Sequence, residues 1–416
     1  MSAAFELLHR VLSLLVLALA VRIVVDAWLE VPYSVLLILI GVMISVLRVD
    51  VGLRLSNEII MTLVLPIVLF NGVLELDRAA LRENVAVPIV LVVVGVPLSV
   101  ALLGSVGTVA FGLPILVSLL FAAIVVPTDP VAVLSLFEEL DAPERLSVVI
   151  DGESLFNDGV AIVIVNVLLA LAAERTTPTD GLEIAGEFVA DVLVVGVGGF
   201  LLGCCLGYGA TRIIRRIPER MAILLVTVLT AYGSFVLAEH VVGASGILAT
   251  VGAGLFVEPT VDGDAVDGDT FAFVRDTWEG GAFLLSTLVY VLIGAQVPIA
   301  SLIDHLRAIL VAAGLVLLVR AVIVYGLVGA VNATATRPFP YSYQHVLVWG
   351  GLHTVVPIAL ALGLPAWVAH REFVRAMVFG VAIVGALVQG FLMPSVLRAA
   401  GIPTRVSRAG STEGAS

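Results

Sequence analysis

Long apolar segments recur along nearly the whole sequence, from near residue 7 to near residue 397. A helix that crosses the hydrocarbon core of a bilayer needs about 20 mostly apolar residues. This rule predicts thirteen segments, at 7–29, 33–48, 57–75, 84–105, 114–137, 145–172, 184–210, 221–239, 244–258, 271–294, 302–331, 343–364 and 372–398. Only 13% of the residues are charged and 60% are hydrophobic, against about 25% and roughly 45–50% in soluble domains. The sequence therefore predicts an all-α polytopic membrane protein.

Arginines in the connecting loops predict the orientation of the chain, because cytoplasmic loops are enriched in basic residues. An odd number of spans puts the two termini on opposite sides of the membrane. If the C-terminus is cytoplasmic, twelve of the 21 arginines flank the cytoplasmic ends of the segments and seven flank the other ends. We therefore predict a cytoplasmic C-terminus. The net charge of −12 argues against a nucleic-acid partner, which requires a basic surface.

Two prolines interrupt the fifth segment, in the sequence Pro127-Thr128-Asp129-Pro130. Proline has no amide hydrogen and disfavours helical geometry in the residue before it, so the helix should unwind here. Unwound backbone is tolerated at membrane depth where it is buried or lines a cavity, and transporters use it to bind ions. The oxygens of Thr128 and Asp129 would suit a hard cation. A proline kink capped by Asp129 is the simpler alternative.

The sixth segment carries a cluster of polar side chains, in which Glu153, Ser154, Asn157 and Asp158 are prominent. Ser154 and Asp158 are four residues apart and therefore share one face of a helix, while Glu153 and Asn157 share the adjacent face. An apolar run continues after Asp158, which indicates that this carboxyl group lies within the membrane. Charged groups at that depth are energetically costly, so Asp158 is a functional candidate that can take up a proton or bind a cation.

Two further polar residues lie in the later segments. Arg320 is in the middle of the eleventh segment, where a buried arginine needs an acidic partner, and we expect Glu153 to be that partner. His353 follows Gly350-Gly351 in the twelfth segment, which we predict to be a second interrupted helix. The fifth and twelfth segments are seven apart in order, as two inverted six-helix repeats around a linking helix would require.

Two motifs carry a resemblance to a known family. VPTDPVAVLSLF (126–137) followed by GESLFNDG (152–159) closely resembles the cation:proton antiporter 1 family, which includes archaeal and bacterial sodium/proton antiporters and animal sodium/proton exchangers. The resemblance covers nearly the whole chain, from LPIVLFNGVLELD (65–77) to ALVQG (386–390). It implies a secondary antiporter rather than an enzyme. Such a protein needs no cofactor, exchanges Na+ (or Li+) for H+ across the cell membrane, and serves pH homeostasis.

The resemblance also implies an architecture of thirteen helices with elevator-like alternating access. Residues 84–172 and 302–398 would form the two halves of the transport core. Residues 1–75 would form the first scaffold helices, residues 184–294 the linker helix and remaining scaffold, and residues 399–416 a cytoplasmic tail. The scaffold of the family forms a homodimer, so the expected partners are monovalent cations, protons, membrane lipid and a second copy of the chain.

By the same resemblance, Asp158 is the carboxylate that binds either the cation or the proton. Asp129, Thr128 and Ser154 would be oxygen ligands or would support them. Asn157 occupies a position where related electrogenic families have aspartate, and it therefore implies electroneutral exchange.

Other positions match the family only in part. Glu153 and Arg320 match a buried structural ion pair. Asn71 stands where the family often has glutamate, which puts one cation ligand in doubt. His353 stands where the family usually has arginine, so that a titratable group replaces a permanent charge. We hypothesise that His353 contributes to the pH response, and the alternative is that it only hydrogen-bonds to the interrupted helix.

Other functions remain open at this point. K+/H+ exchange is the nearest alternative, because oxygen ligands bind both alkali ions. An intramembrane aspartyl protease could use Asp129 and Asp158 as a carboxylate dyad, but the YD and GxGD motifs of that class are absent around these aspartates. An ion channel would need a repeated filter or a ring of pore residues, and the sequence shows neither.

Overall fold

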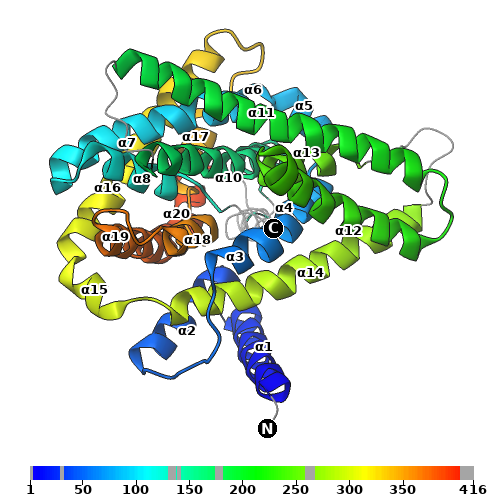
Figure 1. Ribbon diagram of the computed structural model, residues 1–416, viewed down its shortest axis with the longest axis horizontal. Helices are drawn as coiled ribbons and strands as arrows, with labels where there is room; N and C mark the ends of the chain where they lie inside the picture. The colour runs from blue at the N-terminus through cyan, green and yellow to red at the C-terminus, as the bar shows by residue number, and fades with distance from the viewer. Residues whose placement is uncertain are drawn as a thin grey trace, which may run out of the picture. The chain divides into compact units, whose positions relative to one another are not determined.

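The computed structural model describes residues 3–28, 32–129, 137, 142–173, 181–257 and 268–402 (Figure 1). Within these residues the secondary structure is entirely helical. The α-helices are α1 (Ala3–Trp28), α2 (Tyr33–Val46), α3 (Asn57–Ile59), α4 (Leu65–Glu75), α5 (Arg78–Asn84), α6 (Ala86–Val90), α7 (Val96–Phe111), α8 (Ile115–Val125), α10 (Glu144–Ala173), α11 (Gly181–Ile214), α12 (Arg220–Val236), α13 (Gly246–Phe256), α14 (Gly268–Ala295), α15 (Ile299–Asp304), α16 (Leu306–Asn332), α17 (Tyr341–Trp349), α18 (Val355–Gly363), α19 (Arg371–Val384) and α20 (Phe391–Ala399). Pro130 lies outside the described residues, so its predicted role is not tested.

Helix occurs within every apolar segment predicted from the sequence. Eight continuous helices among the described residues are long and apolar enough to cross a membrane: Asn57–Glu75, Ala86–Phe111, Glu144–Ala173, Gly186–Ile214, Arg220–Val242, Gly268–Ala295, Leu306–Asn332 and Arg371–Ala399. The helices α2, α8 and α13 are apolar but shorter. Large apolar side chains of α11, such as Leu193, Val194 and Leu201, are more than half exposed, which suits contact with lipid. The prediction of an all-helical polytopic membrane protein is confirmed.

In the described part of the chain, four π-helical turns widen the long helices: η1 (Ile60–Val64), η2 (Leu91–Gly95), η3 (Leu237–Val242) and η4 (Gly385–Gly390). Three of them have a proline shortly after their end, namely Pro66, Pro97 and Pro394. A proline clashes with the carbonyl four residues before it and gives that carbonyl no amide hydrogen. In each of the three cases that carbonyl belongs to the π-helical turn, so the wider turn accommodates the proline without ending the helix.

The chain divides into two compact units. Unit 1 contains Met1–Asn57, Asp77–Ser154 and Thr287–Ser416, and unit 2 contains Glu58–Leu76 and Leu155–Ser286. The helices α10 and α14 therefore each contribute residues to both units. The predicted division into a transport core and a scaffold concerns which helices move together, and it stays a prediction.

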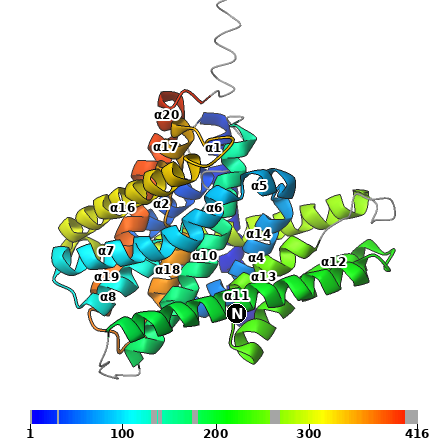
Figure 2. The same ribbon diagram turned by 90° about the horizontal axis from the view of Figure 1, so that it is seen from above.

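In unit 1, α7 packs against α8, and α16 packs against α7 and α19 (Figures 1 and 2). The helix α18 packs against α8 and α19. Arg145 in the first turn of α10 donates to the carbonyls of Arg337 and Pro338, which precede α17, and to the side chain of Asn84 at the end of α5. These contacts bring the two interrupted segments of the sequence into one packed unit.

In unit 2, α13 packs against α11, α12 and α4 (Figure 1). An apolar cluster surrounds α4, in which the rings of Phe70 and Trp278 lie 4.6 Å apart between their centroids. The indole of Trp278 donates to the hydroxyl of Thr227 at 2.9 Å, so its one polar group is satisfied in the core. This cluster fixes the helix that carries Asn71.

Candidate functional site

In unit 1, regular helix ends within the fifth predicted segment and is interrupted within the twelfth, at the places that the sequence predicts. The helix α8 ends at Val125, and residues Pro127 to Asp129 are not helical. The helix α17 ends at Trp349 and α18 begins at Val355, with five non-helical residues between them. The amide of Asp129 donates to the carbonyl of Leu352 at 2.6 Å, so the two unwound segments meet through their backbones.

The unwound segment after α8 also contacts α10. The hydroxyl of Ser154 donates to the carbonyl of Thr128. Both residues are buried. The carbonyl of Thr128 lies beyond the end of α8. It is bound by α10, the helix that carries the polar cluster of the sixth segment. Three of the four predicted cation ligands, Thr128, Asp129 and Ser154, therefore belong to one buried region of unit 1.

The carboxylate of Asp129 accepts hydrogen bonds from two hydroxyl groups that the sequence analysis missed. Tyr290 of α14 donates to Asp129 Oδ2 at 2.8 Å, and Thr354 donates to the same oxygen. All three residues are less than a tenth exposed. A single tyrosine in an apolar span and a threonine next to His353 carry no periodic signal. Only the unusual position of a tyrosine in the middle of an apolar run could have drawn attention to Tyr290.

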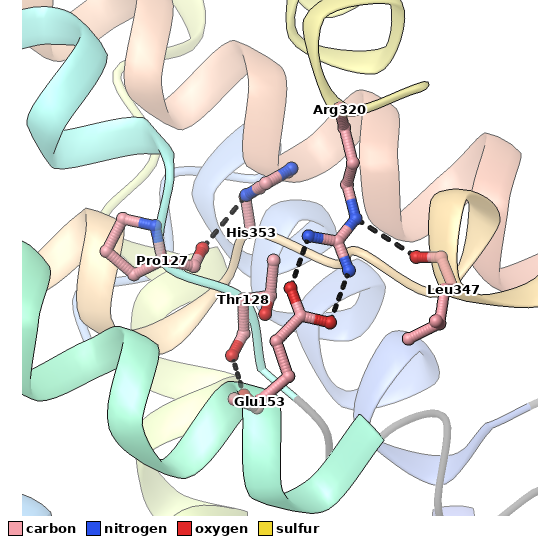
Figure 3. Close-up of polar contacts among 7 residues, drawn as sticks. Pro127, Thr128, Glu153, Arg320, Leu347 and His353 are labelled. Carbon is pink, nitrogen blue, oxygen red and sulfur yellow. Dashed lines mark hydrogen bonds and ion pairs between the residues drawn. The ribbon is translucent and has the colours of Figure 1, made fainter. Parts of the chain in front are cut away.

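Glu153 and Arg320 form a buried ion pair in unit 1, as the sequence analysis expects. The guanidinium donates to both carboxylate oxygens, at 2.8 and 3.1 Å, and its Nε donates to the carbonyl of Leu347 at 3.0 Å (Figure 3). Leu347 lies in the last turn of α17, where carbonyls have no partner within the helix and a cation is favourable. Arg320 therefore neutralises Glu153 and caps the broken helix.

Gly351 allows Arg320 to reach this position. A Cβ atom on Gly351 would lie 2.5 Å from Arg320 Nε and 2.7 Å from its Cδ atom. Real Cβ atoms do not approach other heavy atoms so closely. The glycine pair at the break therefore makes room for the arginine, in addition to interrupting the helix.

The end of α17 is held by a reciprocal pair of hydrogen bonds. The indole of Trp349 donates to the carbonyl of Gln389 at 3.0 Å, and the side-chain amide of Gln389 donates to the carbonyl of Trp349 at 3.0 Å. In the π-helical register the carbonyl of Gln389 would face Pro394, which has no amide hydrogen. The carbonyl of Gln389 in η4 thus accepts a hydrogen bond from the indole of Trp349. The carbonyl of Trp349, at the end of α17, accepts one from the side-chain amide of Gln389.

His353 lies in the break between α17 and α18 and is buried. Its Nδ1 lies 2.9 Å from the carbonyl of Pro127 (Figure 3). A carbonyl can only accept, so the ring donates from Nδ1. His353 therefore ties the second interrupted segment to the first.

Three predicted site residues belong to unit 2. Asn157 and Asp158 are buried on α10, about one turn beyond Glu153 and Ser154 on the same continuous helix. Asn71 is buried on α4, where its side-chain amide donates to Glu75 Oε1 at 2.8 Å. The carboxylate of Glu75, one turn after Asn71, is thus bound by the Asn71 side chain.

The chain has clear relatives among known proteins. A family model described as the transmembrane sodium/hydrogen exchanger matches residues 12–399. The chain is 32% identical to the Na(+)/H(+) antiporter ApNhaP of Aphanothece halophytica, over 90% of this chain and 70% of that protein. It is 30% identical to the Na(+)/H(+) antiporter NhaP of Pseudomonas aeruginosa, over 92% of this chain and 88% of that one.

A solved structure has a similar fold. It is that of the sodium proton antiporter MjNhaP1 from Methanocaldococcus jannaschii, with a TM-score of 0.73 at 21% sequence identity, covering 96% of this chain and 97% of that one. The family match extends over nearly the whole chain and includes both interrupted segments. The protein therefore belongs to the transmembrane sodium/hydrogen exchanger family.

Proposed function

We propose that this protein is a secondary antiporter that exchanges Na+ (or Li+) for H+ across the cell membrane. The observation that carries the proposal is the meeting of two interrupted helices in unit 1, where Asp129 and Leu352 pair through their backbones among buried oxygen atoms. Unwound backbone and half-helix ends are the apparatus with which transporters bind ions. The named relatives, which are sodium/proton antiporters, support the choice of ions.

In this proposal Asp158 is the carboxylate at which the cation and the proton compete. Thr128, Asp129 and Ser154 supply oxygen ligands or hold them in place. Binding of either ion neutralises Asp158, whereas the empty site keeps a charge that is costly to move through a bilayer. Only the protein with Na+ or H+ bound at Asp158 then changes between the two states that face opposite sides of the membrane. Because the empty, charged protein does not change state, sodium flow is coupled to proton flow.

We further propose the finer architecture that the resemblance implies. Thirteen helices would form two inverted six-helix repeats around a linking helix, with a transport core that moves against a scaffold. The scaffold would form a homodimer, and the C-terminus would be cytoplasmic. The arginine-rich end of α11, where Arg212 is followed by Arg215 and Arg216, supports this orientation.

Reconstitution tests the reaction. The full chain is placed in liposomes that contain a pH-sensitive dye, and a Na+, Li+ or K+ gradient is then applied. We expect protons to cross the membrane in the direction opposite to the movement of Na+. Proton movement only with K+ would show a K+/H+ antiporter. Cation flux without a coupled proton flux would indicate a channel, and no flux together with peptide cleavage would indicate a protease.

Exchange is expected to be electroneutral, with one cation moved per proton. The reason is Asn157, which is an amide at the position before Asp158 and so provides no second carboxyl group to carry a proton. The test is the exchange rate in proteoliposomes whose membrane potential is clamped with K+ and valinomycin. We expect the same rate at every clamped potential. A rate that follows the potential would contradict one-to-one exchange.

His353→Asn is expected to retain transport and the wild-type pH profile. The amide nitrogen of asparagine lies close to the place of Nδ1 in histidine, so it can still donate to the carbonyl of Pro127. His353→Ala removes that hydrogen bond and is expected to lower the rate. The measurement is the exchange rate against pH for the three proteins. A shifted pH midpoint in His353→Asn would instead show that titration of the ring contributes to the pH response.

A further inference from the structure

Tyr290 of α14 lies outside the two interrupted segments and is hydrogen-bonded to Asp129. Its hydroxyl donates to Asp129 Oδ2 at 2.8 Å, and the hydroxyl of Thr354 donates to the same oxygen. The Asp129 amide is bound as well, by the carbonyl of Leu352. Asp129 is thus held at its backbone by one unwound segment and at one carboxylate oxygen by two separate elements.

The part of α14 that carries Tyr290 has a fixed place within unit 1. A Cβ atom on Gly41 of α2 would lie 2.2 Å from the carbonyl oxygen of Val291, and one on Gly294 would lie 2.1 Å from the carbonyl oxygen of Ile38. The two helices therefore cross in direct backbone contact, as small residues permit in membranes. The hydroxyl of Ser45 also donates to the carbonyl of Val297 at 2.9 Å. The Tyr290 hydroxyl is accordingly presented by a rigid support.

Two donors on one oxygen orient the carboxylate. They fix the plane in which its oxygens lie, because rotation would break both hydrogen bonds. An alkali-ion site selects by the distance, number and field strength of its oxygens. A carboxylate held in one orientation can discriminate between ions of different radius, whereas one that rotates can adapt to a larger ion.

We propose that Tyr290 is a positioning residue that sets the preference of the transport site for Na+ over K+, by holding the Asp129 carboxylate in one orientation together with Thr354. The inference rests on the proposed function, since it takes Asp129 to be a ligand or support of the transported cation. Tyr290 itself is assigned no contact with the ion. Thr354 acts at the same oxygen and is the N-terminal cap position of α18.

The test uses Tyr290→Phe in the reconstituted full chain, with K+ measured as a competitor of Na+-driven proton flux. Loss of one hydrogen bond is expected to raise the KM for Na+ about three- to tenfold, while the maximal rate stays within about twofold of wild type. The ratio of the apparent inhibition constant of K+ to the KM for Na+ is expected to fall. The reason is that a carboxylate free to rotate accommodates the larger ion. Thr354→Val is expected to have the same effect, and Thr354→Ser, which keeps the hydroxyl, is expected to have wild-type selectivity.

The matched control is Tyr325→Phe. Tyr325 is also in unit 1, and its hydroxyl is hydrogen-bonded to His345 Nδ1 at 2.6 Å. This variant is expected to keep the wild-type KM and ion ratio. A lower maximal rate in Tyr290→Phe with unchanged KM and ion ratio would overturn the inference. If Tyr290→Phe does not fold, wild-type selectivity in Thr354→Val would overturn it equally. Absence of Na+-driven flux in the wild type would refute the proposed function itself.

Discussion

Asp158→Asn is expected to reduce Na+-driven proton flux to the level of protein-free liposomes while the protein still inserts and folds. Asparagine has nearly the same shape as aspartate, so it should be accommodated at this buried position of α10. It has no carboxyl group, however, and can neither take up a proton nor offer a charge to a cation. The measurement is flux in proteoliposomes, combined with size-exclusion profiles and melting of the purified protein.

Asp191→Asn is the control for this experiment. Asp191 is an exposed acid on α11 of the same unit, and its replacement is expected to leave flux unchanged. Together the two variants separate loss of one particular carboxyl group from loss of an acid in general. Sodium-driven flux near the wild-type rate in Asp158→Asn would refute the role of this residue.

Arg320→Met is expected to destabilise the fold by about 3–5 kcal/mol, because it leaves the carboxylate of Glu153 buried without its cation. The pair is well shielded, since the side chains of Arg320 and Glu153 are 14% and 6% exposed. The same change removes the hydrogen bond that caps the last turn of α17 at Leu347. We expect a clearly lower melting temperature in detergent, with a larger effect on stability than on the apparent affinity for Na+.

The double variant Glu153→Leu with Arg320→Met should recover part of this loss, because apolar side chains of similar volume leave no unpaired charge in the interior. Full recovery is not expected, since the carbonyl of Leu347 still lacks its donor. The comparison is a melting series of the wild type, both single variants and the double variant. A double variant that melts below Arg320→Met would show that the ion pair is not the source of the stability.

Features that arise from strong local rules are predictable from the sequence. Pro127 removes an amide hydrogen, and the positions of proline and glycine indicate both interrupted helices. The pairing of Glu153 with Arg320 is also predictable, because a charge inside an apolar segment needs a partner of opposite sign. The helical class follows from the apolar segments alone, since lipid leaves few alternatives for a backbone.

Other features depend on tertiary contacts that leave no pattern in the sequence. The hydroxyls of Tyr290 and Thr354 are single polar groups whose importance comes from the carboxylate they meet, and that carboxylate lies more than 150 residues away from each along the chain. The backbone bond between Asp129 and Leu352 involves no side chain, so no residue type indicates it. Gly351 is visible in the sequence only as an interruption, although it also provides room for Arg320.

Proton release on sodium binding is the most direct test of competition at Asp158. The purified protein is kept in weakly buffered detergent solution with a pH-sensitive dye, at a pH where exchange is active, and NaCl is added against a choline chloride control. Because a cation displaces the proton from a shared carboxyl group, we expect acidification by about one proton per chain. We expect no acidification from Asp158→Asn. Sodium binding without proton release, or equal release from Asp158→Asn, would contradict the account.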